Sequence, residues 1–144
     1  MSQPVGLFPV TYNIGAGLPG APNFYLGLLV NTPDKVVSGA GRITQAVNPP
    51  VDVRTNVNGT YTYMATMKDV HILVVATGYP VVDWPPHGGI GPVLLPNLHL
   101  RMVLAQDWAS GTATYKYLNA SGEWIEVDNV PVKLVKPEAV PQAA

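Results

Sequence analysis

Hydrophobic and polar residues alternate along most of the chain, and this pattern predicts β-strands with one buried face. In the clearest case, residues 97–104, every second residue is apolar, and His99 and Arg101 fall on the opposite face. Residues 112–118 and 123–128 alternate in the same way on either side of a turn-rich segment, which predicts a hairpin. No segment shows the 3.6-residue period of an amphipathic helix. We therefore expect an all-β chain with little or no helix.

An Asn-Gly pair at residues 58–59 predicts another hairpin. Both residue types tolerate the positive φ angles of a type I′ turn, and alternating segments flank the pair. The two strands of this hairpin would be residues 51–57 and 60–67. We expect the second strand to bury Tyr61 and Tyr63 on its inner face.

The chain of 144 residues contains 14 glycines and 15 prolines, which indicates many turns. Short strands at close spacing predict an antiparallel β-sandwich or a flattened barrel of about eight to ten strands. We expect one all-β domain over residues 1–136 and a disordered C-terminal tail over residues 137–144.

Two predicted strands, residues 24–30 and 72–76, are apolar on both faces. A strand of this kind needs a cover on both sides. Either the proline-rich loops or a second subunit could supply the outer cover. Because only 12% of the residues are charged, association with another subunit is a real alternative.

The charge and composition exclude several classes of function. A net charge of −1 without a basic run argues against binding to nucleic acid. No apolar stretch approaches the roughly 20 residues of a membrane-spanning helix, so we expect no membrane insertion. The chain has no cysteine, which leaves the compartment open. Its N-terminal residues show no signal peptide, which favours a cytoplasmic location.

Each candidate motif for catalysis or cofactor binding lacks a residue or an element that its chemistry requires. Residues 15–20 match G-x-G-x-x-G, but no helix follows to hold a phosphate. Residues 87–91 are similar to a glycine-rich oxyanion loop, but the nucleophile motif G-x-S-x-G is missing. His71 and His99 could approach each other across paired strands, yet a metal site normally needs three or more ligands. We therefore expect no cofactor, no metal site and no enzyme activity.

The long segment 78–96, with five prolines and four glycines, is the candidate binding site. An aromatic and a histidine side chain on a proline-stiffened loop offer a large contact area at low entropic cost. The candidate residues for binding a ligand or a partner are Tyr79, Asp83, Trp84 and His87. In the alternative interpretation, Trp84 folds back as a plug over an apolar strand face.

Several segments together carry a family resemblance: Val5–Pro9, Val30–Lys35, Ser38–Ala46, Asn48–Pro50, Gly59–Met64, Gly78–Pro80 and Asp107–Tyr115. They resemble an uncharacterised bacterial family, domain of unknown function 1842. The resemblance covers most of residues 4–135. It implies a bacterial origin and brings no catalytic residue, substrate or cofactor.

Our leading interpretation is a non-catalytic all-β module that binds a protein partner or itself as a homo-oligomer. The alternative is a small apolar ligand in a barrel-like interior, in the manner of a lipocalin. An enzyme that uses scattered groups such as His71, His99 and Asp83 is a third possibility. In the lipocalin-like alternative the interior would be lined by Tyr61, Tyr63, Met67, Leu98, Leu100 and Met102.

Overall fold

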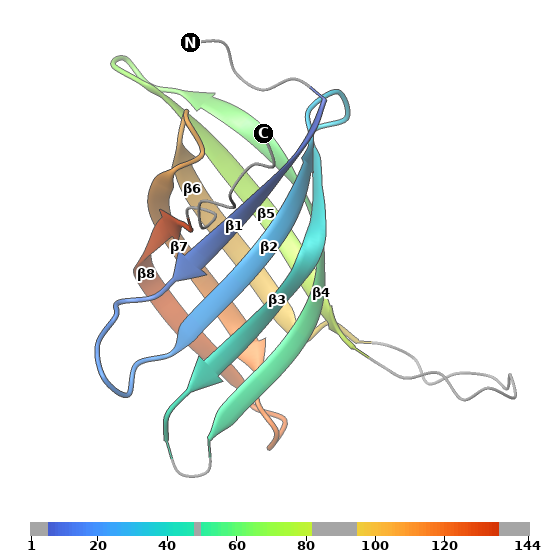
Figure 1. Ribbon diagram of the computed structural model, residues 1–144, viewed down its shortest axis with the longest axis vertical. Helices are drawn as coiled ribbons and strands as arrows, with labels where there is room; N and C mark the ends of the chain where they lie inside the picture. Colours follow the sequence, from blue (N-terminus) through green and yellow to red (C-terminus); the bar gives the residue numbers. More distant parts are fainter. Residues whose placement is uncertain (1–5, 48–49, 82–94, 136–144) are drawn as a thin grey trace, which may run out of the picture.

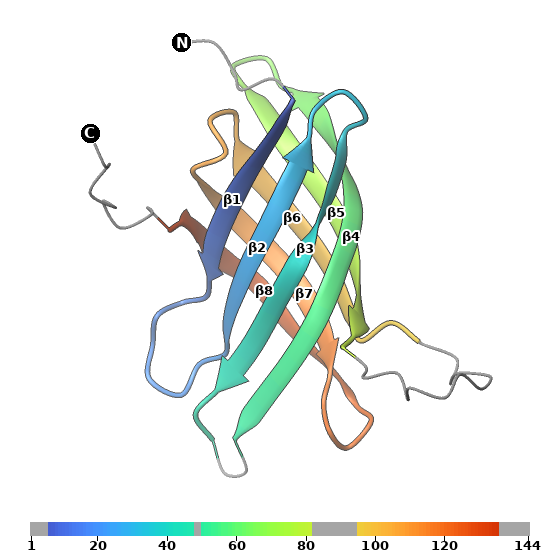
Figure 2. The same cartoon turned by 45° about the vertical axis from the view of Figure 1, so that its right-hand side comes forward.

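The computed structural model describes residues 6–47, 50–81 and 95–135, which form a closed antiparallel barrel of eight strands in sequential order (Figures 1 and 2). This confirms the all-β prediction and selects a barrel over a sandwich. Within these residues, no helix is long and apolar enough to cross a bilayer. The strands are β1 Leu7–Ile14, β2 Asn23–Asn31, β3 Val36–Gln45, β4 Val51–Ala65, β5 Val70–Pro80, β6 Leu98–Ala105, β7 Ser110–Leu118 and β8 Trp124–Leu134.

The barrel closes through a short ladder between β1 and β8, in which Tyr12 pairs with Leu134 and Ile14 with Val132. Closure reduces the sheet edge that is open to edge-to-edge association, although within the described residues Leu7–Val10 of β1 do not pair with β8. A bulge in β8 adjusts the register beside this seam. There Asn129 adopts a positive φ of 49°, and its N–H donates a hydrogen bond of 3.2 Å to Thr114 Oγ1.

Alternate side chains from all eight strands fill the interior. In β6 the predicted alternation is confirmed, because all four apolar residues of its inner face are buried while His99 and Arg101 are exposed. The hairpin predicted near the C-terminus is also confirmed as β7 and β8. The largest fully buried side chains are Tyr12, Tyr115, Tyr117, Phe24, Ile14, Leu26, Ile43, Ile72, Leu98, Met102, Leu104 and Val30.

The hairpin predicted at Asn58-Gly59 is wrong, because β4 runs without a turn from Val51 to Ala65. Asn58 pairs with Ser38 on one side and with Thr77 on the other, so the chain passes straight between two neighbouring strands. Neither Asn58 nor Gly59 has the positive φ that a type I′ turn requires. The hairpin that does follow β4 turns at residues 66–69.

Gly59 allows β4 to approach the backbone of β5 closely. A Cβ atom placed at Gly59 would lie 2.2 Å from the Val75 carbonyl oxygen and 2.6 Å from Ala76 Cα. Real Cβ atoms do not approach other atoms this closely. The glycine is therefore required by the curvature of the barrel, as glycines in strongly bent strands often are.

Tyr61 and Tyr63 share the inner face of β4 as predicted, but only Tyr61 is buried. Tyr63 lies near the end of the strand and is exposed, although its ring contacts that of Tyr61 edge to face at 5.9 Å. Met67 lies in the turn after β4 and is fully exposed. The prediction that both tyrosines are hidden is therefore right for one and wrong for the other.

Trp108 closes one end of the barrel from the turn between β6 and β7. Its side chain is only 3% exposed, and its ring contacts those of Phe8 and Tyr61 at centroid distances of 5.5 and 5.0 Å. The Tyr12 hydroxyl donates a 2.7 Å hydrogen bond to the Trp108 carbonyl. Trp108 holds a positive φ of 65°, which non-glycine residues rarely adopt, so these contacts hold the backbone in a costly conformation.

Candidate functional site on the outer surface of the barrel

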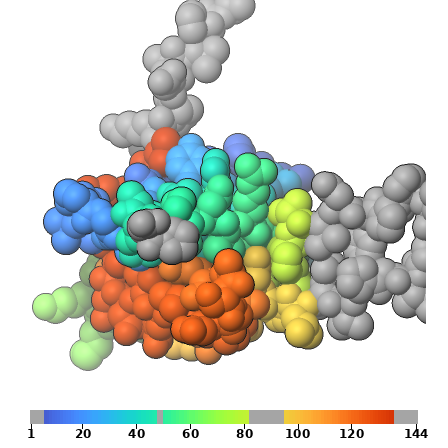
Figure 3. All heavy atoms as spheres, turned by 90° about the horizontal axis from the view of Figure 1, so that it is seen from below, coloured from blue at the N-terminus to red at the C-terminus, as the bar shows by residue number. Residues whose placement is uncertain are grey.

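Aromatic rings occupy the barrel interior and join its opposite walls. Phe24 on β2 contacts Tyr115 on β7 with ring centroids 5.1 Å apart, and Tyr117 lies beside Tyr115. Seen from below, the side formed by β1–β4 lies directly against the side formed by β6–β8 (Figure 3). A lipocalin-like guest would have to displace these rings. Its predicted lining is also incomplete, because Tyr63 and Met67 are exposed.

Two buried tyrosine hydroxyls in this interior differ in their hydrogen bonding. The Tyr12 hydroxyl donates to the Trp108 carbonyl, whereas the Tyr115 hydroxyl has no partner among the described residues. Burial is the main reason that the pKa of each phenol is raised well above its ordinary value. Both side chains therefore stay neutral, and only the Tyr12 hydroxyl gains a bond in exchange for the lost water.

Tyr12→Phe is expected to lower the free energy of unfolding by about 1–2 kcal/mol, because the Trp108 carbonyl loses its buried donor. Tyr115→Phe is expected to leave the stability unchanged or to raise it slightly, because it removes a buried hydroxyl that makes no bond within the described residues. Urea denaturation followed by circular dichroism measures both effects. An equal loss in the two variants would contradict this account.

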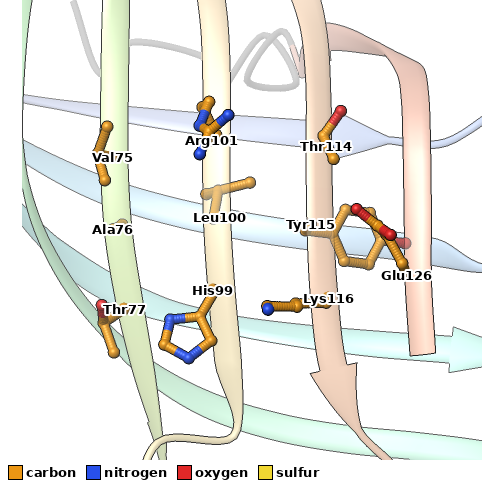
Figure 4. Close-up of a pocket in the computed structure, with 10 residues that line it drawn as sticks. All are labelled: Val75, Ala76, Thr77, His99, Leu100, Arg101, Thr114, Tyr115, Lys116 and Glu126. Atoms are coloured by element: carbon orange, nitrogen blue, oxygen red, sulfur yellow. The ribbon is translucent and has the colours of Figure 1, made fainter. Parts of the chain in front are cut away.

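The outer surface of β5–β8 carries a groove of about 380 Å³, which we call the β5–β8 groove. Strand register sets its first row, in which Thr77, His99, Lys116 and Glu126 lie side by side across four strands (Figure 4). The next row holds Val75, Arg101 and Thr114. The backbone of the inward-facing residues Ala76, Leu100 and Tyr115 lies beneath these rows.

The groove brings cationic side chains together without pairing them. Among the residues that the structure describes, Arg42 and Asp52 form the one salt bridge, so Arg101 and Lys116 have no carboxylate partner there. Lys116 Nζ lies 5.9 Å from the centroid of the Trp124 ring, and the His99 ring lies 5.2 Å from it. Trp124 is therefore an outer-surface residue.

The outer surface of β1–β3 differs in being almost free of charge, and we call it the uncharged face. Arg42 is the one charged residue among the outward-facing positions of these three strands. Its guanidinium makes two hydrogen bonds of 2.8 and 2.7 Å to Asp52, and this contact lowers the pKa of the Asp52 carboxyl. The exposed apolar residues of the face are Leu7, Tyr25, Leu29 and Val36.

The doubly apolar strands predicted from the sequence therefore have uncovered outer faces. On β2, Leu29 is 43% exposed, and on β5, Val75 is 48% exposed. Among the residues that the structure describes, neither the loops nor the rest of the barrel covers these two side chains.

The candidate residues of the segment 78–96 lie mostly beyond what the structure describes. Tyr79 is at the end of β5, faces outward opposite Asn56 and is exposed. Asp83, Trp84 and His87 lie outside the described residues. The binding site predicted at these four residues therefore stays a prediction.

The end of this segment is anchored by a buried polar pair. The Thr55 hydroxyl donates a 2.8 Å hydrogen bond to Asn97 Oδ1, and Asn97 Nδ2 donates to the Arg54 carbonyl at 3.1 Å. The Asn97 N–H also donates to the Gly78 carbonyl at 2.8 Å. These bonds tie the chain entering β6 to β4 and β5.

His71 and His99 do not approach each other. The register places His71 beside Ala105 and His99 beside Thr77, so about 20 Å of strand separates them. Within the described residues, no group of three histidine, aspartate or glutamate side chains lies close enough to hold a metal.

Reasoning from the sequence missed the row that includes Lys116 and Glu126. Alternation correctly placed His99 and Arg101 outward on β6. Which residues of β7 and β8 lie beside them depends on strand register, and nothing in the local pattern specifies it. The sequence did contain one signal: alternation places Lys116 and Glu126 on the outer face of the hairpin predicted from residues 112–118 and 123–128.

Comparison of the sequence with known proteins identifies the family of the chain. Among curated proteins, none matches the chain. The family described as domain of unknown function DUF1842 matches residues 5–124, which is most of the chain and extends from before β1 to the first residue of β8. The chain therefore belongs to the DUF1842 family.

Proposed function

We propose that this chain is a non-catalytic β-barrel module that associates with a second copy of itself through the uncharged face of β1–β3. The observation that carries the proposal is the near absence of charge over three adjacent strands, together with exposed Leu7, Tyr25 and Leu29. Contiguous exposed apolar surface is typical of interaction sites. The bacterial origin and the cytoplasmic location expected from the sequence belong to this proposal.

A second copy suits this face for an electrostatic reason. In a two-fold dimer the same surface is presented by both partners, so any unpaired charge near the axis meets its own like charge. The uncharged face avoids this repulsion because Arg42 is already neutralised by Asp52. A strongly charged partner, in contrast, would lose water without finding a counter-charge.

The shape of the uncharged face also suits contact with the same face of a second copy. Leu29 lies beside Pro9 on β1 and Ser38 on β3, and two residues along β2 the small Gly27 lies beside Ala40. A protruding leucine of one copy can therefore enter the low area over Gly27 of the other. Such self-complementary pairs of knob and hollow are what an isologous interface requires.

Leu29→Lys is expected to weaken self-association at least about tenfold, because two unpaired ammonium groups would be buried near each other. Size-exclusion chromatography with light scattering over a dilution series measures the dissociation constant. Val75→Lys is the matched control, since Val75 is equally exposed and apolar but lies on β5. It is expected to leave association unchanged.

A wild-type chain that stays monomeric at high concentration would refute self-association. Equal weakening by the two lysine variants would refute the location of the interface. Position 29 faces solvent in the monomer, so a lysine there is expected to leave folding unaffected. Circular dichroism checks that each variant keeps the all-β fold. A loss of association can then be assigned to the surface and not to unfolding.

A further inference from the structure

The geometry points to a second binding site on the opposite wall of the barrel, in which the β5–β8 groove binds a small hydroxylated organic anion, a sugar acid or a sugar phosphate. This inference is independent of the uncharged face, because no residue of β1–β3 lines the groove. It rests on three features: unpaired cationic side chains, polar groups suited to hydroxyls, and the size of the hollow.

The unpaired cations favour an anion. Arg101 and Lys116 come from adjacent strands and line one hollow, and neither has a carboxylate within salt-bridge distance among the described residues. Like charges brought together without a counter-ion raise the electrostatic energy, and a bound anion lowers it. The Arg101 guanidinium can donate two parallel hydrogen bonds to a carboxylate or a phosphate, whereas Lys116 acts as a point charge.

The remaining side chains of the groove suit hydroxyl groups. Glu126 pairs with Lys116 in the strand register but forms no salt bridge with it, so its carboxylate can accept a hydrogen bond from a ligand hydroxyl. Thr114 Oγ1 already accepts the Asn129 N–H, and its own hydroxyl proton remains available to donate. The groove therefore offers both a donor and an acceptor beside the cationic centre.

The size and the charge pattern restrict the ligand to a small molecule. A hollow of about 380 Å³ lies at the lower end of the range for small-molecule sites, roughly 300–1,000 Å³. A continuous nucleic-acid backbone does not suit the groove, because the Glu126 carboxylate lies beside Lys116 and would repel successive phosphates. A ligand with one anionic group and nearby hydroxyls can bind the cationic side chains through the anion and Glu126 through a hydroxyl.

The test uses the full chain and four probes: glucuronate, glucose 6-phosphate, inorganic phosphate and glucose. Amide chemical-shift titration by NMR reports both affinity and location. Glucuronate or glucose 6-phosphate is expected to bind with shifts confined to β5–β8, and glucose at least about tenfold more weakly. Comparing the two anionic sugars shows whether the group bound is a carboxylate or a phosphate.

Arg101→Gln is expected to weaken binding of the preferred sugar anion about tenfold or more. Arg54→Gln is the matched control, because Arg54 is an exposed arginine on β4 that lines a separate hollow. Glu126→Gln is expected to reduce the preference for that sugar anion over inorganic phosphate, because it weakens the acceptor for the sugar hydroxyl. All three exchanges lie on the exposed surface, so folding is expected to be unaffected.

Three outcomes would overturn the inference. The first is that neither anionic sugar binds at millimolar concentration. The second is equal binding of glucose and the anionic sugars, which would remove the role of the cations. The third is equal weakening by Arg101→Gln and Arg54→Gln, which would reduce the effect to the overall charge of the protein.

Discussion

Trp108→Ala is expected to lower the free energy of unfolding by about 3–5 kcal/mol. The indole ring is buried between Phe8 of β1 and Tyr61 of β4, two strands that are not neighbours in the sheet. Its removal leaves a cavity where several elements meet, and the backbone keeps its costly positive φ. Guanidinium denaturation followed by far-ultraviolet circular dichroism measures the change without depending on tryptophan fluorescence.

Trp124→Ala is the matched control for this prediction. Trp124 is 44% exposed and contacts only surface side chains, including His99 and Lys116, in the described part of the chain. We expect its loss to cost less than about 1 kcal/mol. If the two alanine variants were destabilised equally, the assignment of Trp108 as the residue that closes the barrel would be wrong.

Gly59→Ala is expected to destabilise the barrel by about 2–3 kcal/mol, even though alanine adds only one methyl group. That methyl would meet the backbone of β5 at Val75 and Ala76, and backbone atoms cannot move aside as a flexible side chain can. Either β4 and β5 separate locally and weaken their ladder, or the strand loses its bend. Denaturant unfolding compared with the wild type measures the loss.

Gly27→Ala separates this steric effect from the general difference between glycine and alanine. Gly27 lies in β2, and the nearest atom to a Cβ placed there is the Ala40 carbonyl oxygen at 3.9 Å, an ordinary contact. Without a collision, alanine only restricts the unfolded chain, so the variant is expected to be neutral or more stable by up to about 1 kcal/mol. A loss at Gly27 as large as that at Gly59 would show that close approach is not the cause.

The two glycine variants also explain why Asn58-Gly59 predicts a turn that the structure does not contain. Asn58-Gly59 is a strong local signal for a turn, because glycine tolerates positive φ. In the structure the same glycine is needed for its missing Cβ, within an extended strand. Both uses of glycine look identical in a sequence, and the choice between them depends on how closely another strand approaches.

For the candidate sites too, the sequence gives the direction of single side chains, and the fold decides which of them lie together. The outward direction of Arg101 follows from its position between Leu100 and Met102, but its neighbours in the groove come from three other strands. The uncharged face likewise combines β1, β2 and β3, and its lack of charge becomes visible only when their outer positions are placed side by side. The binding residues predicted on the segment 78–96 rest on local composition, which carries no information about register.

The amino-acid sequence by itself determined that this chain is all-β, which residues of β6 face inward and where the last hairpin turns. These properties are local, because the pleat sends successive side chains to opposite faces with a period of two. Only the tertiary structure decided that the sheet closes as a barrel, that β4 is one bent strand and that Arg101, Lys116 and Glu126 line one groove. These properties depend on which strands pair and in which register, and a one-residue change of register would move every side chain to the other face.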